Sequence, residues 1–175
     1  MWEKEEIYVN YADIKRVDVA NGEGVRVSVF VSGCNHHCKG CFNVETWDFN
    51  GGKEFTNSDL KYILDNINKN NIKRNLAILG GEPLCPQNVK GVIELCKQFK
   101  KVYPEKMIYL WTGYVVEDFD YTQMEIFKYV DVLVDGKFEE DKKNLSIMLR
   151  GSSNQRVIDV NKSLNNHDIV MYEVG

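Results

Sequence analysis

The stretch GVRVSVFVSGCNHHCKGCFN, residues 24–43, joins a strand pattern directly to a cluster of three cysteines. Every second residue of its first part is a valine: Val25, Val27, Val29 and Val31. This period-2 alternation is typical of a β-strand. The cysteines follow with the spacing C-x3-C-x2-C, at Cys34, Cys38 and Cys41. The stretch therefore predicts a strand whose carboxyl end leads into a metal-binding loop.

Three further apolar runs of strand length end in the same way, in polar or glycine-rich residues. They are residues 76–79 before GGEP, residues 107–111 before TGY, and residues 130–134 before DG. Helical patterns lie between them, with capping residues at 56–59 ahead of the first, an apolar face from Val89 to Cys96, and residues 121–129. Strands that alternate with helices predict an α/β fold with a mainly parallel sheet.

The length of the chain limits the architecture. A closed eight-unit barrel needs about 250 residues, and this chain has 175. We therefore expect an incomplete (β/α) barrel or an open curved sheet, forming a single domain over residues 1–175. The carboxyl ends of parallel strands share one face, so the motifs that follow the strands are predicted to converge there.

Composition limits the kinds of partner that the protein can bind and the compartment in which it is expected. The net charge is −4 and basic residues occur only in short clusters, which excludes a nucleic-acid-binding stripe. The first ten residues, MWEKEEIYVN, are too charged for a signal peptide, and the apolar runs are too short to span a membrane. We expect a cytoplasmic protein. Five cysteines, an odd number in a reducing compartment, do not indicate a disulfide framework.

The cysteine cluster allows two kinds of metal site. Three thiolates plus His36 or His37 would make a closed zinc site. A 4Fe-4S cluster held by three thiolates instead leaves one iron open for another ligand. Zinc motifs usually come as two separate ligand pairs, so the compact spacing favours the iron–sulfur cluster and leaves zinc as the alternative.

Gly80, Gly81 and Glu82 form the second motif, at the end of an apolar strand. Glycines let a ligand approach the backbone closely, and carbonyls exposed there can accept hydrogen bonds from an ammonium group. The Glu82 carboxylate would add a negative charge for the same ammonium. The plainer interpretation is a strand-to-helix turn.

Together these two motifs resemble the signature of the radical S-adenosylmethionine enzymes, C-x3-C-x-φ-C followed by GGEP. Position φ, usually aromatic in that superfamily, is Gly40 here. The resemblance implies a 4Fe-4S cluster on Cys34, Cys38 and Cys41, with S-adenosylmethionine on the open iron and cleaved to a 5′-deoxyadenosyl radical. It also implies an incomplete barrel of the radical S-adenosylmethionine type, open on one side.

Over residues 11–160 the chain resembles the activating proteins of anaerobic, class III ribonucleotide reductases. The shared motifs are GCNHHCKGCFN, GGEPLCPQNV, LWTGY, DVLVDGKF and RGSSNQRVIDV, and that family carries glycine at φ. The resemblance implies hydrogen-atom abstraction from a glycine of the large catalytic subunit of the reductase. It also implies a flavodoxin- or ferredoxin-type electron donor, and an open side that admits the partner's glycine loop.

The resemblance assigns roles to individual residues. Gly40, Cys41 and Phe42 are expected beside S-adenosylmethionine, with Phe42 either at the adenine or in loop packing. Gly80, Gly81 and Glu82 are expected at its amino end. Thr112 and Asp135, each at a strand end, are expected either at the ribose or carboxylate or as turn and cap residues.

Other polar residues and cysteines near the motifs are not expected to bind the cluster. His36 and His37 are expected to hydrogen-bond or face solvent, since ligation would close the open iron. Cys85 and Cys96 are expected to pack in the interior. Asn154 and Gln155 face either cofactor or partner.

Three alternatives remain open at this stage. Another glycyl-radical activase, such as that of pyruvate formate-lyase, would be expected to be longer and to carry an aromatic residue at φ. A radical enzyme acting on a small molecule, such as one making a deazapurine, is more distant. The third alternative is a zinc-stabilised adaptor without enzymatic activity, which metal analysis would separate from the others.

Overall fold

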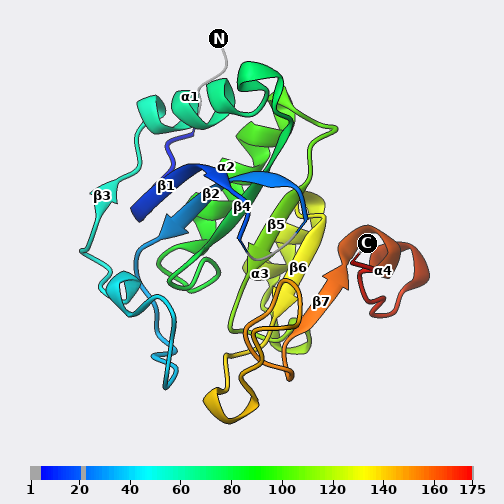
Figure 1. Ribbon diagram of the computed structural model, residues 1–175. Coiled ribbons are helices and arrows are strands. Elements are labelled where there is room, and N and C mark those ends of the chain that lie inside the picture. The colour runs from blue at the N-terminus through cyan, green and yellow to red at the C-terminus, as the bar shows by residue number, and fades with distance from the viewer. Residues whose placement is uncertain (1–4, 21–22, 175) are drawn as a thin grey trace.

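The computed structural model describes residues 5–20 and 23–174, which form one seven-stranded sheet with helices packed on it (Figure 1). The strand order is β3-β1-β2-β4-β5-β6-β7. The four central strands are mutually parallel: β2 (Val25–Val31), β4 (Arg74–Gly80), β5 (Ile108–Trp111) and β6 (Val132–Asp135). This centre confirms the predicted α/β alternation and the strands expected at the motifs.

The outer strands are antiparallel, so the sheet is mixed rather than uniformly parallel. β1 (Asn10–Asp18) pairs antiparallel with β2, β3 (Lys53–Glu54) with β1, and β7 (Arg156–Asp159) with β6. Among the described residues β3 and β7 are the two edges, and the sheet does not close on itself. The open architecture is as expected. Its assignment to one particular barrel type stays a prediction.

The helices begin where the sequence supplies caps. In α1 (Asn57–Asn66) the Thr56 side chain accepts the Asp59 N–H while Asp59 accepts the Thr56 N–H, which is a capping box. α2 (Val89–Val102) follows the GGEP turn and α4 (Val160–Asn166) follows β7. The helix predicted over residues 121–129 is α3 (Tyr121–Met124) continued by the 3₁₀ helix η4 (Glu125–Lys128). Short 3₁₀ turns complete the chain: η1 (Val44–Thr46), η2 (Lys69–Asn71), η3 (Val116–Asp118) and η5 (Glu140–Lys142).

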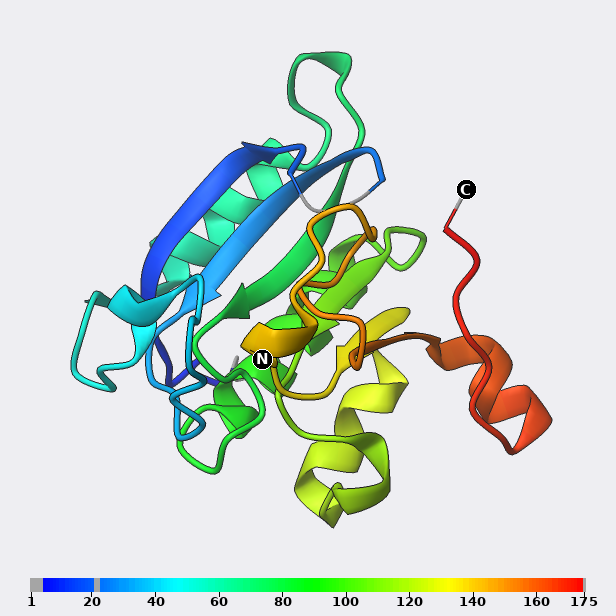
Figure 2. The same ribbon diagram turned by 60° about the horizontal axis from the view of Figure 1, so that its bottom comes forward.

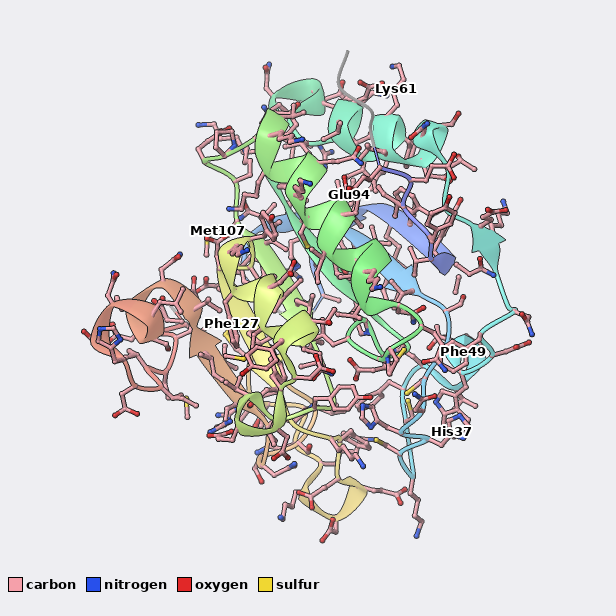
Figure 3. All side chains as sticks on the ribbon, turned by 180° about the vertical axis from the view of Figure 1, so that it is seen from behind. His37, Phe49, Lys61, Glu94, Met107 and Phe127 are labelled. Atoms are coloured by element: carbon pink, nitrogen blue, oxygen red, sulfur yellow. The ribbon has the colours of Figure 1, made fainter. Side chains whose placement is uncertain are left out.

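Helices α1, α2 and α3 cover one face of the sheet (Figures 1 and 3). Strand residues that alternate along β2, β4 and β5 pack against them in one apolar cluster: Val27, Val29, Val31, Leu76, Ile78, Ile108 and Leu110. Cys96, on α2, is fully buried in this cluster, which confirms its expected place in the core. No helix of the described residues is long and apolar enough to cross a membrane.

Among the described residues, no α-helix packs against the opposite face of the sheet (Figure 2). Its residues form a second, smaller cluster: Ala77, Tyr109, Val132, Val134, Leu149 and Val157. Leu149 belongs to residues 136–155, an irregular stretch between β6 and β7 that we call the covering segment, drawn in yellow to orange across this face in Figure 2. The site described below lies between the carboxyl ends of the parallel strands and the covering segment.

Candidate functional site

A cavity of about 330 Å³ opens where the parallel strands end. Eight residues with predicted roles line it: Cys34, Cys38, Cys41, Phe42, Gly80, Gly81, Glu82 and Thr112. The rest of the lining comes from the same loops (His36, Asn43 and Gly113), from strand residues of the open face (Phe30, Leu79 and Trp111) and from the covering segment. Motifs far apart in sequence are therefore brought together as the parallel topology predicts. Gly40 and Asp135 lie outside the lining.

The three cysteines of the cluster are free thiols on the wall of this cavity. The backbone N–H of His36 donates to Cys34 Sγ and that of Asn43 to Cys41 Sγ, each at 3.4 Å. Burial raises the pKa of Cys34 and of Cys38 above the ordinary value. Free of metal, these two groups therefore favour the neutral thiol, and metal binding must release their protons.

The donor set is compatible with a multi-iron cluster. Thiolates around one zinc sit about 2.3 Å from the same atom. Within the described part of the chain, no group of three or more His, Cys, Asp or Glu side chains surrounds a point that could hold one ion. In a cluster each cysteine binds a different iron, so the sulfurs need not converge on one atom.

The start of the cysteine loop is fixed by close backbone contacts. The Gly33 N–H donates to Thr46 O at 2.7 Å, and the Cys34 N–H donates to Trp47 O at 3.1 Å. Gly33 has φ +99°, and a Cβ there would lie 2.1 Å from the Phe49 ring, so only glycine fits. His37 is exposed and stacks on Trp47, with ring centroids 4.4 Å apart; Figure 3 labels His37 and Phe49 on the same side of the molecule.

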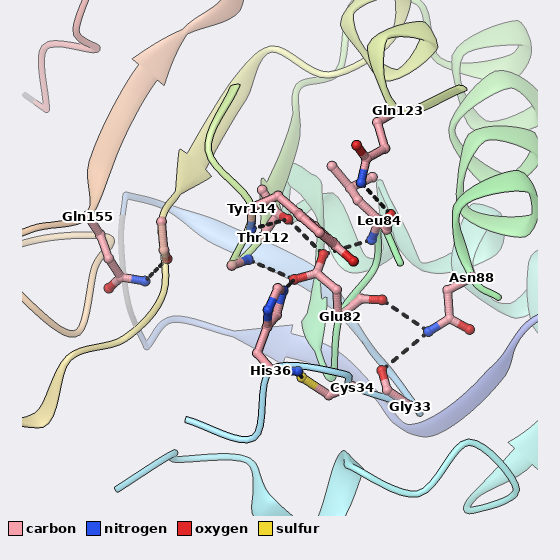
Figure 4. Close-up of polar contacts among 12 residues, drawn as sticks. Gly33, Cys34, His36, Glu82, Leu84, Asn88, Thr112, Tyr114, Gln123 and Gln155 are labelled. Carbon is pink, nitrogen blue, oxygen red and sulfur yellow. Dashed lines mark hydrogen bonds and ion pairs between the residues drawn. The ribbon is translucent and has the colours of Figure 1, made fainter. Parts of the chain in front are cut away.

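Glu82 is a buried hub that accepts four hydrogen bonds (Figure 4). Its Oε1 accepts from the Leu84 N–H at 2.8 Å and from the Thr112 hydroxyl at 2.7 Å. Its Oε2 accepts from His36 Nε2 at 2.8 Å and from the Gly113 N–H at 2.7 Å. A carboxylate has about four acceptor sites, so protein donors fill all of them.

His36 connects the cysteine loop to this hub. Its ring is largely buried, packs edge-on against Tyr114 at 4.7 Å between centroids, and hydrogen-bonds to Glu82. A Cβ on Gly113 would lie 2.5 Å from the His36 ring, so the glycine of the TGY motif leaves room for it. The expected hydrogen-bonding role of His36 is confirmed, and it ties three motifs together.

The GGEP turn packs directly on the cysteine loop. The Gly81 N–H donates to Val31 O at 2.8 Å, and the Glu82 N–H donates to Gly33 O at 2.7 Å. A Cβ on Gly81 would lie 2.4 Å from Gly33 O, so this close approach requires glycine. The turn and the loop therefore form one rigid wall of the cavity.

Asn88 holds both halves of this wall and was missed by sequence reasoning. Its buried side-chain amide donates to Ser32 O and to Glu82 O, each at 3.0 Å. Ser32, just before the cysteine loop, and Asn88 are 56 positions apart in sequence, so only the fold brings the two together. The one local signal was its place immediately before α2, at the N-cap.

Thr112 and Asp135 both serve the backbone of turns. The Thr112 Oγ accepts from the Tyr114 N–H at 3.2 Å while its hydroxyl donates to Glu82. Asp135 is buried, accepts the Val116 N–H at 3.0 Å and binds the Arg156 guanidinium through both oxygens, at 2.9 and 2.5 Å. These contacts match the turn and cap alternative, and Thr112 also reaches the cavity.

Side chains of the RGSSNQ motif shape the covering segment. Gln155 donates to Gly136 O at 2.9 Å, and its Oε1 accepts the Gly151 N–H at 2.9 Å and the Ser152 N–H at 3.2 Å. Asn154 donates to Lys137 O at 2.8 Å. The segment is therefore held by amide side chains at its two ends, and Gln155 also lines the cavity.

Of the two remaining candidates, Phe42 lies on the cavity wall and Cys85 lies in the interior. Phe42 is 51% exposed, lines the cavity and packs on Phe138, with ring centroids 5.0 Å apart. Cys85 is fully buried outside the cavity lining, and burial raises its pKa to about 11. The packing interpretation of Cys85 is confirmed.

Comparison with known proteins adds independent information. A family model described as a 4Fe-4S single cluster domain matches residues 20–158. The chain is 43% identical over 150 residues to a protein of Escherichia coli K12, covering 85% of this chain and 97% of that protein. It is 41% identical over 160 residues to a protein of phage T4, covering 91% and 100%. A Pasteurella multocida protein is 41% identical, covering 84% and 95%. All three are named anaerobic ribonucleoside-triphosphate reductase-activating protein.

Proposed function

Because the chain belongs to the family of the anaerobic ribonucleoside-triphosphate reductase-activating proteins, we propose that it activates an anaerobic ribonucleotide reductase by a radical S-adenosylmethionine mechanism. The protein partner is the large catalytic subunit of that reductase. A flavodoxin- or ferredoxin-type protein supplies the electron, and the activity resides in one cytoplasmic domain spanning residues 1–175. The proposal makes this chain an oxidoreductase.

Cys34, Cys38 and Cys41 bind three irons of a 4Fe-4S cluster, and the protein leaves the fourth iron open. S-adenosylmethionine bound there would supply, on one-electron reduction with release of methionine, a 5′-deoxyadenosyl radical that can take a hydrogen atom from the α-carbon of a glycine in the reductase. The observation that carries this proposal is that the three cysteines line the same cavity as the GGEP turn.

The residues of the cavity bind and orient the cofactor in this proposal. Gly80 and Gly81 present backbone that the amino end of S-adenosylmethionine can approach. Glu82 contributes its charge to that end and fixes the turn, since protein donors already fill its acceptor sites.

The remaining assigned residues act at the nucleoside end. Gly40, Cys41 and Phe42 lie along it, with the exposed Phe42 ring against the adenine. Thr112 contacts the ligand from the cavity wall. Asp135 contributes from behind that wall by holding Arg156 and the Val116 backbone.

The open side of the cavity suits a macromolecular substrate. Enzymes that act on small molecules gain from closure that excludes water. Here the sheet is open, and one wall of the cavity is the irregular covering segment, which contacts the cysteine loop through Phe138 and Phe42. A glycine-bearing loop of the reductase can reach such a site without passing through a barrel.

The decisive experiment is anaerobic reconstitution with iron and sulfide, followed by dithionite, S-adenosylmethionine and the cognate reductase subunit. The expected result is 5′-deoxyadenosine together with a glycyl-radical doublet in electron paramagnetic resonance. Nucleoside release without the doublet would reject the assigned substrate. Stoichiometric zinc without sulfide would reject the cluster and favour the adaptor alternative.

Cysteine variants test the ligand assignment separately. Replacing Cys34, Cys38 or Cys41 by alanine is expected to abolish the iron–sulfur absorbance after reconstitution. Cys85→Ala is the matched control, since that thiol is buried outside the cavity lining, and it should retain the absorbance. Loss of absorbance in Cys85→Ala alone would contradict the assignment.

A further inference from the structure

Arg150, the first residue of the RGSSNQ motif, has no role in the function proposed so far. It lies in the covering segment and lines the cavity together with the three cysteines. Among the described residues that line this cavity, Arg150 is the only lysine or arginine and Glu82 the only acid. One positive and one negative group therefore contribute to the same space.

The guanidinium of Arg150 is incompletely satisfied. Its Nη1 donates to Gln155 O at 2.7 Å, while its Nε is buried without a hydrogen-bond partner. Over the described part of the chain no carboxylate lies within ion-pair distance of it. Glu82 forms no ion pair with Arg150, and its carboxylate oxygens are bound by four other donors. A partly buried cation without a counter-ion is costly, and an anionic ligand in the cavity would relieve that cost.

The backbone on both sides of Arg150 is fixed. The carbonyl of the buried Leu149 accepts from Trp111 Nε1 at 2.6 Å, and Leu149 has φ +68°. A non-glycine residue in this region is strained, and such strain persists only where surrounding contacts enforce it. On the other side the Gly151 N–H donates to Gln155, and a Cβ on Gly151 would lie 2.9 Å from the Phe42 ring.

From this geometry we propose that Arg150 binds the carboxylate of the amino-acid end of S-adenosylmethionine, in the cavity that Gly80 and Gly81 also line. This inference rests on the function proposed above and names the residue that recognises one group of the cofactor. Guanidinium groups bind carboxylates through paired, charge-assisted hydrogen bonds. The rest of the RGSSNQ motif then has a purpose, because Gly151 and Gln155 hold Arg150 at the wall.

The test measures ligand affinity rather than turnover. The protein with its reconstituted, oxidised cluster is titrated by calorimetry with S-adenosylmethionine. Arg150→Met is expected to weaken binding about 10- to 100-fold, the range for loss of hydrogen bonds to a charged group. Arg150→Lys keeps the charge without the paired geometry and should fall between Arg150→Met and the wild type.

A second ligand separates recognition from a structural effect. 5′-Methylthioadenosine lacks the amino-acid end, so its affinity, measured by competition, should be the same in Arg150→Met and wild type. The matched control variant is Lys142→Met, because Lys142 is a half-exposed cation of the same segment outside the cavity lining. It should bind both ligands normally.

The outcomes distinguish this inference from the proposed function. Wild-type affinity for S-adenosylmethionine in Arg150→Met, or equal losses for both ligands, would overturn the inference and leave the proposed function standing. Failure of the wild-type protein to bind S-adenosylmethionine would reject both. If Arg150→Met does not fold or take up its cluster, Arg150→Lys decides: full affinity for the cofactor speaks for a purely electrostatic or structural role and against paired recognition.

Discussion

The two walls of the cavity are built by different means. One wall, formed by residues 33–43, 80–82 and 112–113, follows the ends of parallel strands and is held by the buried Glu82 carboxylate. The other, the covering segment, contains only the 3₁₀ turn η5 (Glu140–Lys142) and one isolated bridge between Lys143 and Ser152. The first wall is part of the core of the fold, whereas the second is held by side-chain amides, a few backbone hydrogen bonds and the buried Leu149, whose carbonyl accepts from Trp111.

This difference assigns separate tasks to the two walls. The cysteines and the GGEP turn must keep fixed relative positions, and a buried, filled hydrogen-bond network provides that rigidity. We expect the covering segment to open at lower cost than the sheet, because regions with few regular hydrogen bonds unfold locally more readily. If the two walls differ in this way, substitutions in the first should lower the stability of the whole fold, and substitutions in the second should loosen only the covering segment.

The largest effect is expected for Glu82→Ala. It leaves the N–H groups of Leu84 and Gly113 and the side chains of Thr112 and His36 without their acceptor. Loss of one partner from a buried charged network costs about 3–5 kcal/mol. The measurement is urea unfolding of the cluster-free, reduced protein followed by circular dichroism.

Glu105→Ala is the control for this experiment, since Glu105 is exposed and its replacement should change stability by less than about 0.5 kcal/mol. A loss below about 1 kcal/mol in Glu82→Ala would show that the carboxylate does not hold the first wall.

A smaller loss is expected for Gly113→Ala. The new Cβ would lie 2.5 Å from the His36 ring and would push it away from Glu82. Overpacking of this kind costs about 1–3 kcal/mol. The cost should largely disappear in a His36→Ala background, and a double-mutant cycle by urea unfolding measures this coupling. Additive losses would mean that the glycine is required for another reason.

Much of the first wall could be predicted from sequence, because it depends on local patterns and one topological rule. The apolar runs that end in motifs predicted the central parallel strands. Because parallel strands share one carboxyl edge, Cys34 and Gly80 were expected at the same site, and both line the cavity. The antiparallel edges could not be predicted in the same way. β1 is mostly exposed and lacks an alternating apolar pattern, while β7 has only four residues.

Residues that act through distant backbone carbonyls also escaped prediction. Asn88 donates to a carbonyl 56 positions away, and Arg150 reaches the cavity only through the fold of the covering segment. Asp135, in contrast, was predicted as a possible ligand contact and lies outside the cavity lining. Its position at a strand end allowed a ligand contact, and only the structure shows it engaged by Arg156.

A substitution in the covering segment is expected to speed hydrogen exchange only within that segment. Gln155→Ala removes one hydrogen bond to Gly136 O and two from the N–H groups of Gly151 and Ser152. Amides of residues 136–155 should exchange with deuterium about 10-fold faster, equivalent to about 1.4 kcal/mol, while those of β4 and β5 keep their wild-type rates. Hydrogen exchange with mass spectrometry resolves the two regions.

Ser153→Ala is the matched control for that comparison, because the Ser153 side chain is exposed and its backbone contact to Lys142 O is retained. Equal acceleration in β4 and β5 would show that the covering segment and the sheet unfold together, and the distinction between the two walls would fail.

The smallest effect concerns the ion pair that anchors the base of the covering segment. Arg156 binds Asp135 at the end of β6 and, at 2.9 and 2.7 Å, both oxygens of Glu117 in η3. The hydrogen bonds from Arg156 lower the pKa of Glu117 from 4.5 to about 2. A carboxyl group with a lowered pKa in the folded state stabilises the fold fully above its ordinary pKa, and this contribution is lost as the pH falls from about 4.5 towards 2.

Glu117 is 58% exposed, so solvent screening limits the effect to at most about 1 kcal/mol. Glu117→Gln should therefore be slightly less stable than the wild type at pH 7, and the difference should shrink at pH 3, as measured by urea unfolding at both values. The same difference at both values would show that protonation of Glu117 does not weaken this anchor.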